Sequence, residues 1–292
     1  MSGTLFVVAT PIGNLEDLTF RALRTLKDVD VIAAEDTRRT AKLLAHYQVR
    51  KPLMSVHEHN EQREIPRVIE RLRRGESIAL VTDAGTPGIA DPGARVVHAV
   101  RAAGLPVVPI PGPSAVAAAL SVSGFPADQF VFMGFPPRSG SAREEWFRTL
   151  KADRRAVVFF EAPHRIERTL SDLKLLSVKR PILIGREMSK IHEQLVYIGN
   201  WTVSERPNRS SGPPESRGEF TIIVGSAEND DTEQRQHSDV VDIFGRLTNL
   251  AEFTDDIALH IMESAFNVSP SEVRKAVKRH RISVDQQNKS RA

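Results

Sequence analysis

Short apolar runs rich in β-branched residues alternate with amphipathic helical patterns from the start of the chain to about Ser226. The apolar runs have strand length, whereas the segments between them repeat apolar residues at helical spacing. Such alternation predicts an α/β fold with largely parallel sheets. The expected strands are Leu5–Ala9, Val29–Ala34, Ser77–Thr82, Val107–Pro111, Gln129–Gly134, Ala156–Phe160, Pro181–Gly185 and Phe220–Gly225. The expected helices include Leu18–Lys27, Thr37–Tyr47, Gln62–Arg74, Ala94–Ala103, Ser114–Ser123 and Ile166–Leu176.

Breaks in this pattern predict two α/β domains and a helical appendage. Pro111, Gly112 and Pro113 stop regular structure and suggest a domain boundary. The segment Ser204–Gly218 has the composition of a surface loop, and residues 227–238 that of a polar linker. Helical patterns then close the chain. We therefore expect domains at 1–112, 113–226 and 239–292, the last a small all-helical module.

Composition excludes several classes of protein. The chain has no cysteine, so it has no disulfide, no thiolate zinc site, no cysteine-ligated iron–sulfur cluster and no cysteine nucleophile. No basic segment precedes the first apolar run, and no run approaches the ~18 apolar residues of a membrane span. These features predict a cytoplasmic protein with no membrane contact.

The loop from Asp83 to Gly93 is the strongest sign of a ligand site. Its three glycines allow a ligand to approach the backbone, and its two prolines hold the shape of the loop. Asp83 and Asp91 offer carboxylates to ribose hydroxyls or to an amino group. The chain has no G-x-x-x-x-G-K-[ST] motif and no G-x-G-x-x-G motif after its first strand. Their absence disfavours a nucleoside triphosphate or a dinucleotide as the ligand. The alternative is a turn that needs these residues for its geometry alone.

Histidines and charges elsewhere have weaker interpretations. His57 and His59 invite a metal interpretation, but no third ligand follows nearby, so we expect no metal site. His164 follows a strand and is equally consistent with a site or with a helix start. Charged residues such as Arg186 and Glu187 follow the carboxyl end of the strand Pro181–Gly185. We expect them to point into the crevice beyond the strand ends, where the ligand loops also lie.

The ordered motifs resemble one family. They are Thr10–Leu15, Ala34–Arg38, His57–Asn60, Asp83–Gly93, Pro111–Ala115, Glu161–Arg165 and Arg186–Lys190. Together they are similar to the ribosomal RNA small subunit methyltransferase I family, the bacterial 16S rRNA cytidine-2'-O-methyltransferases within the tetrapyrrole methylase superfamily. The resemblance runs from about residue 3 to residue 226.

This resemblance implies S-adenosyl-L-methionine in a cleft between two α/β domains, a homodimer, and 16S rRNA of the small ribosomal subunit as partner. The helical module resembles a helix-turn-helix-like domain. Phe160 and Ala162 depart from the tyrosine and serine that relatives often carry, so no hydroxyl role is assigned there. The implied cofactor residues are Pro11, Asp83, Gly85, Thr86, Ile89, Asp91, Ser114, Ala115, Phe160, Glu161, Glu219 and Thr221.

Methyl transfer to a ribose hydroxyl needs alignment of the reacting atoms and benefits from proton removal. Asp36, Glu187 and Lys190 are the candidate groups near the acceptor. A small-molecule (tetrapyrrole-type) methylase on the same fold is the main alternative, and a non-catalytic RNA-binding regulator is a second. A basic tail carrying Lys275, Lys278, Arg279 and Arg281 favours an RNA partner and is expected to add salt-sensitive affinity.

Overall fold

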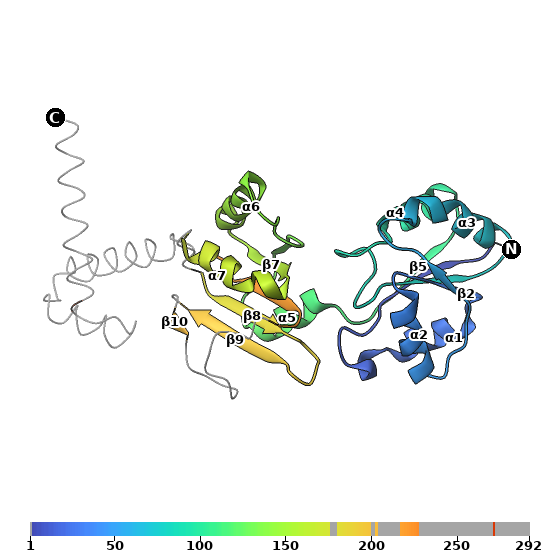
Figure 1. The fold of residues 1–292 in the computed structure, drawn as a ribbon, viewed down its shortest axis with the longest axis horizontal. Helices are drawn as coiled ribbons and strands as arrows, with labels where there is room; N and C mark the ends of the chain where they lie inside the picture. Colours follow the sequence, from blue (N-terminus) through green and yellow to red (C-terminus); the bar gives the residue numbers. More distant parts are fainter. Residues whose placement is uncertain (1, 176–179, 200–201, 204–216, 228–270, 272–292) are drawn as a thin grey trace, which may run out of the picture. The chain divides into compact units, whose positions relative to one another are not determined.

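The computed structural model describes residues 2–175, 180–199, 202–203, 217–227 and 271 (Figure 1). Residues 1–227 form one compact unit and residues 228–292 a second. The predicted helical module, its basic tail and most of the 204–218 loop lie outside the described residues.

The first sheet is wholly parallel, as the sequence predicted. Its strand order is β3-β2-β4-β1-β5, and each neighbouring pair runs in the same direction. Parallel strands align their carboxyl ends at one edge, so the loops that follow them gather there. The strands are β1 (Leu5–Val8), β2 (Val31–Ala34), β3 (Leu53–Ser55), β4 (Ile78–Val81) and β5 (Val107–Ile110).

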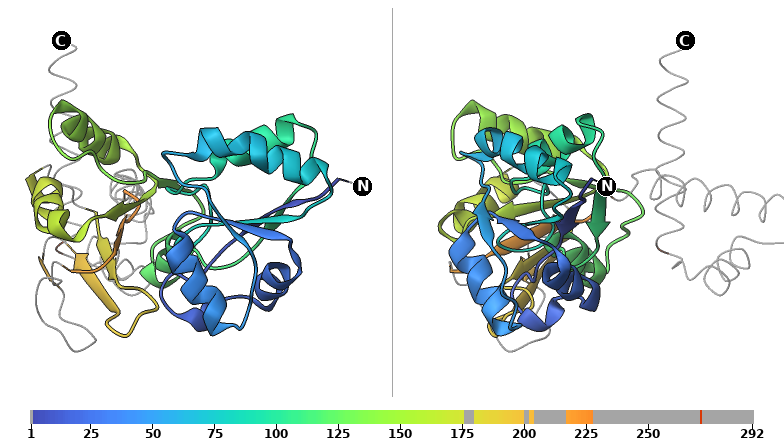
Figure 2. Two further views of the ribbon diagram at one scale, coloured as in Figure 1. Left: turned by 45° about the vertical axis from the view of Figure 1, so that its right-hand side comes forward. Right: turned by 90° about the vertical axis from the view of Figure 1, so that its right-hand side faces the viewer.

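Helices cover both faces of this sheet (Figures 1 and 2). On one face, Val8 and Ile32 pack with apolar residues of α1 (Phe20–Asp28) and α2 (Thr37–His46). On the other face, Val31 and Ala33 pack with residues of α3 (Glu61–Arg73) and α4 (Ala94–Ala102). Successive strand side chains point to opposite faces, so one strand serves both layers.

Every strand of the second sheet follows Pro113 in the sequence. Its order is β10-β9-β8-β11-β7-β6, with buried apolar side chains on both faces. The elements of this half are α5 (Ala115–Ser123), β6 (Phe130–Phe132), α6 (Ser141–Ala152), β7 (Ala156–Glu161), α7 (Ile166–Leu175), β8 (Ile182–Arg186), β9 (Gln194–Gly199), β10 (Thr202–Val203) and β11 (Phe220–Val224). Two short 3₁₀ helices, η1 (Leu15–Asp17) and η2 (Pro163–Arg165), complete the described elements.

The expectation of largely parallel strands is wrong for the second sheet. Among the pairs described there, β6 and β7 are parallel, whereas β11 runs antiparallel to both β7 and β8. The seven residues between β8 and β9 are too few for a parallel crossover, so β9 returns antiparallel to β8. The sequence interpretation also missed β3, β9, β10 and α6.

A buried carboxylate holds the start of α4. Glu61, in the first turn of α3, is 5% exposed and accepts hydrogen bonds from the backbone N–H groups of Gly93, Arg95 and Val96 at 3.0–3.2 Å. The capping residue Gly93 has no side chain to do this itself. Glu61 therefore fixes the point at which the Asp83–Gly93 loop enters α4.

Replacing Glu61 by alanine is expected to lower the free energy of unfolding by about 2–4 kcal/mol. The variant leaves buried N–H groups without an acceptor, and hydrogen bonds to a charged group contribute about 1.5–3 kcal/mol. Glu70→Ala on the exposed side of the same helix is the control. Urea denaturation of both variants measures the difference, and equal midpoints would contradict the capping role.

Candidate active site

One pocket brings loops of the two sheets together. Its volume is about 310 Å³, within the range of small-molecule sites. One wall comes from the loop after β4 and the start of α5, and the other from the carboxyl end of β7, from β8 and from β11. The lining residues are Ile12, Ala84, Gly85, Thr86, Ile89, Ala90, Asp91, Ser114, Ala115, Val116, Phe135, Phe160, Glu161, Ala162, Pro163, Gly185, Met188, Glu219, Phe220 and Thr221.

The loop after β4 is held in shape by backbone contacts. Gly85 and Thr10 exchange two backbone hydrogen bonds of 2.9 and 3.0 Å, and Thr86 Oγ1 donates to the Pro113 carbonyl at 3.2 Å. Gly85 has φ +80°, a backbone conformation that residues with a side chain rarely adopt. Ala90 adopts φ +61° without being glycine. Strained residues of this kind concentrate at ligand sites, which supports the ligand interpretation of the loop over a plain turn.

Aromatic rings form the apolar side of the pocket. The ring of Phe160, in β7, lies 5.5 Å from that of Phe135 and 5.0 Å from that of Phe132, measured between centroids. Phe135 is half exposed although it is a large apolar residue. The pocket therefore offers apolar aromatic surface that water reaches on one side, which suits a heteroaromatic ring.

Asp91 is a carboxylate of the pocket with a raised pKa. Burial, and next the nearby negative charge of Glu35, raise the pKa of Asp91 to about 6. Asp91 lines the pocket. A hydrogen-bond donor or a cation beside a carboxylate with a raised pKa stabilises its charged form.

Glu161 is committed to internal partners. It is buried, its Oε1 lies 2.8 Å from Arg165 Nε, and it accepts the N–H of Ala162 at 2.8 Å. Arg143 lies 3.9 Å from its other oxygen. Glu161 therefore fixes the turn that follows β7. Because its oxygens already have internal partners, it is less available to a ligand than Asp91 is.

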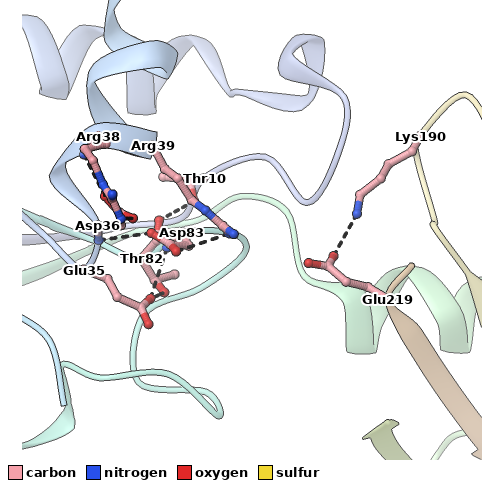
Figure 3. A network of polar contacts seen from close by, with 9 residues as sticks. All are labelled: Thr10, Glu35, Asp36, Arg38, Arg39, Thr82, Asp83, Lys190 and Glu219. Atoms are coloured by element: carbon pink, nitrogen blue, oxygen red, sulfur yellow. Dashed lines mark hydrogen bonds and ion pairs between the residues drawn. The ribbon is translucent and has the colours of Figure 1, made fainter. Parts of the chain in front are cut away.

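A polar network lies at the carboxyl edge of the first sheet (Figure 3). Glu35 accepts from Thr82 Oγ1 at 2.6 Å, and Asp83 accepts the N–H of Asp36 at 3.1 Å. Arg39 lies 3.3 Å from the Asp83 carboxylate. The hydrogen bond from the Arg38 side chain keeps the pKa of Asp36 below its usual range. Asp36 also caps α2, so it is an ionised structural group and a weak base.

Lys190 lies between two carboxylates on the other side of the site. Its Nζ is 2.8 Å from Glu187 and 3.0 Å from the pocket residue Glu219, as Figure 3 shows for the second pair. Burial disfavours the charge on Lys190, but these two hydrogen bonds outweigh it and raise the pKa of Lys190. Burial also opposes the charge on Glu187, yet the bonds from Lys190 and from the Glu219 N–H lower the pKa of Glu187. Both groups are therefore held charged.

The loop that carries Lys190 contacts the loop after β1. Ser189 Oγ accepts the N–H of Asn14 at 2.9 Å, and Glu187 and Ser189 both have positive φ. A Cβ atom on Gly13 would lie 2.4 Å from the side chain of Lys190. Only glycine at position 13 therefore allows this close approach between segments about 175 residues apart.

Comparisons with known proteins agree with this arrangement. The family model described as Tetrapyrrole (Corrin/Porphyrin) Methylases matches residues 4–202. Ribosomal RNA small subunit methyltransferase I of Xylella fastidiosa is 46% identical over 230 residues, which cover 78% of this chain and 84% of that protein. The chain belongs to the ribosomal RNA small subunit methyltransferase I family.

Two further similarities are informative. The family member from Thermotoga maritima is 43% identical over 226 residues, which cover 77% of this chain and 100% of that protein. A crystal structure of uroporphyrin-III C-methyltransferase from Thermus thermophilus, complexed with S-adenyl homocysteine, has a TM-score of 0.50 at 20% identity and covers 76% of this chain and 97% of its own. The second similarity confirms the fold.

The structure places most of the cofactor residues that the family resemblance implied around the pocket. Pro11 and Asp83 do not line it, although each lies beside a lining residue. Asp83 instead contacts Asp36 and Arg39. Asp36, Glu187 and Lys190 also lie outside the lining, and in the described part of the chain no hydrogen bond or ion pair joins Asp36 to the other two. The implied residues that do line the pocket are Gly85, Thr86, Ile89, Asp91, Ser114, Ala115, Phe160, Glu161, Glu219 and Thr221.

The sequence interpretation missed several lining residues, among them Ile12, Phe135 and Met188. Ile12 lies within a family motif and was open to prediction, but Phe135 follows a strand end with no distinctive signal. His59 donates its N–H to His57 Nδ1 at 3.2 Å. In the described segments, no three His, Asp or Glu side chains are grouped as metal ligands. No helix there is both long and apolar enough to cross a membrane.

Proposed function

We propose that this protein transfers a methyl group from S-adenosyl-L-methionine to the ribose 2'-hydroxyl of a cytidine in 16S rRNA of the small ribosomal subunit. The observation that carries the proposal is the pocket that joins the Asp83–Gly93 loop to β7 and β11 in a chain of this family. Family members such as the Xylella protein are named as ribosomal RNA methyltransferases. We place the reaction in the cytoplasm and expect a homodimer, which sedimentation would test.

The pocket residues fit the three chemical parts of S-adenosyl-L-methionine. Phe135 and Phe160 offer an apolar surface to the adenine ring. Asp91 offers a carboxylate to ribose hydroxyls or to the amino group, and its raised pKa favours such a partner. The backbone at Gly85, free of a side chain, permits close approach. When bound, S-adenosyl-L-methionine supplies an electrophilic methyl group on sulfur.

The residues outside the pocket lining suit the acceptor. Lys190 is held protonated by Glu187 and Glu219, so its ammonium group can stabilise negative charge that develops on a ribose oxygen. Because Asp36 and Glu187 are ion-paired, each is a weaker base than a free carboxylate. We therefore assign most of the acceleration to alignment, which supplies about 7–11 kcal/mol in favourable cases.

A small-molecule methylase on the same fold is the competing function. It would use the same cofactor loops but would need no contacts to phosphate. The two functions differ in the acceptor that becomes labelled, so one experiment decides between them.

Cells that lack this protein are expected to lose one 2'-O-methylcytidine from 16S rRNA. Mapping of ribose methylation in ribosomal RNA from cells with and without the gene would show the loss. A plasmid copy of the wild type should restore the modification, and a Gly85→Val copy should not. Unchanged methylation, together with label from S-adenosyl-L-methionine in a tetrapyrrole, would favour the small-molecule function.

A further inference from the structure

Basic side chains gather on the helices that cover one face of the first sheet. Between residues 20 and 51 the chain has eight Lys and Arg against four Asp and Glu, a net charge of +4, whereas the whole chain has only +3. We call the exposed group the basic face. It consists of Arg21, Arg24, Arg38, Arg39, Lys42 and Arg50.

The cations of the basic face lie on one side of the sheet, because α1 and α2 pack on the same face of it. On α2, Lys42 follows Arg38 by four residues and Arg39 by three, so these cations form one stripe. The opposite side of α2 buries Thr40 and Leu44 against the sheet. The stripe therefore points to solvent.

Ion pairs involve only part of the basic face, since Arg38 pairs with Asp36 and Arg39 with Asp83. On α3, Arg63 and Arg67 both pair with Glu64, and Arg71 pairs with Glu76. By contrast, within the described residues no carboxylate lies at ion-pair distance from Arg24 or Lys42. Cations without an internal partner produce a positive potential that favours a polyanion.

The basic face starts at the rim of the pocket. Arg39 contacts Asp83, which immediately precedes the pocket residue Ala84. Past Arg39, α2 continues for seven residues, about 10 Å, toward a surface groove of about 900 Å³ whose lining includes Arg50 and Lys51. A strand of phosphates along α2 would thus lead to the site of methyl transfer.

An exposed aromatic side chain adjoins the basic face. Phe20 opens α1 directly before Arg21 and is 91% exposed. Unpaired bases of RNA stack on such rings, and Arg and Lys contact the neighbouring phosphates. An acidic protein partner would use the cations but would gain less from the isolated ring.

The matched region alone makes up the whole of the Thermotoga family member. That protein therefore has no residues left to match the remaining part of this chain. RNA contacts that the two proteins share would lie within the matched region.

We infer that the basic face of α1 and α2 binds the phosphate backbone of the RNA substrate and guides it to the pocket, with Phe20 stacking on a base. This inference rests on the proposed function. It assigns substrate binding to a surface separate from both the cofactor pocket and the C-terminal tail.

Binding of the full-length protein to a 16S rRNA transcript at several salt concentrations tests this inference. The triple variant Arg24→Gln, Lys42→Gln, Arg50→Gln should bind about a hundredfold more weakly at about 50 mM salt, and its log–log salt slope should flatten by about 2. The matched control is Arg73→Gln, Arg95→Gln, Arg101→Gln, which removes the same charge from α3 and α4. The control should bind like the wild type.

Phe20→Ala provides a second and different readout. It should lower RNA affinity about fivefold or more without changing the salt slope, because stacking releases no counterions. Both triple variants should still bind the demethylated cofactor product in calorimetry, which shows that they are folded.

Three outcomes would overturn the inference. They are equal losses in the two triple variants, wild-type slopes in the first triple variant, or weaker binding by it to intact small subunits but not to free RNA. The last would indicate a protein partner. If the RNA results hold while no methyl group is transferred, the proposed function fails and the RNA surface stands.

Discussion

Gly85→Val is expected to weaken binding of S-adenosyl-L-methionine strongly while the protein stays folded. Gly85 lines the pocket with φ +80°, and a β-branched residue in this conformation forces the loop to move. The Cβ would already lie 3.6 Å from Ile12 Cγ2, so the two methyl groups of valine would enter space at the pocket. We expect a loss on the order of a hundredfold or more, about 2.7 kcal/mol.

Gly104→Val is the matched control for this variant. Gly104 has φ +72°, and beyond its chain neighbours no atom lies within 4 Å of the position that a Cβ would take there, so valine brings similar backbone strain without affecting the pocket. Both variants should lose about 1–3 kcal/mol of stability, but only Gly85→Val should lose cofactor binding in calorimetry. Equal affinities in the two variants would show that the cofactor lies elsewhere.

Cofactor affinity is expected to fall as pH drops below about 6, because the ionised form of Asp91 accepts much stronger hydrogen bonds from the ligand than the protonated form does. Its pKa is raised to about 6 by burial and then by Glu35. Affinity should fall about tenfold for each pH unit well below this value. Asp91→Asn should bind more weakly at pH 7.5 and should lose most of this dependence.

The same variant is expected to raise stability at neutral pH. A folded-state pKa above the unfolded value means that the neutral form of Asp91 stabilises the fold at low pH, and that this contribution is lost as pH rises through about 6. Asparagine stays neutral, so Asp91→Asn should gain about 1 kcal/mol at pH 7.5 after solvent screening is allowed for. Asp128→Asn, on an exposed loop, is the control for both measurements. A stability loss in Asp91→Asn would contradict this assignment.

Local patterns predicted the elements better than their arrangement. Strands such as β4 and β11 were found to within a residue or two, since their apolar runs end at glycine or polar residues. Strand direction has no local signal, so the antiparallel position of β11 was not predicted. β3, with three residues, is too short for periodicity to detect.

Within the candidate site, local patterns likewise reveal some residues and miss those that only the packing of distant segments brings together. The Asp83–Gly93 loop is recognisable by its glycines and prolines, whereas Phe135 reaches the pocket only through the packing of β6 and β7. The contact between Glu61 and the start of α4 joins residues 32 or more positions apart. No spacing rule connects them.

The position of β11 has a consequence for the order in which this chain can fold. The first sheet is complete once β5 has been synthesised, because its five strands all precede residue 111. In the second sheet β11 separates β7 from β8, so these two strands must wait for the last strand of the described sequence before either is fully paired. Such distant pairing slows folding. Glu219, Phe220 and Thr221 arrive with the same strand, and the newly made chain therefore acquires its central strand and its ligand pocket in a single late step.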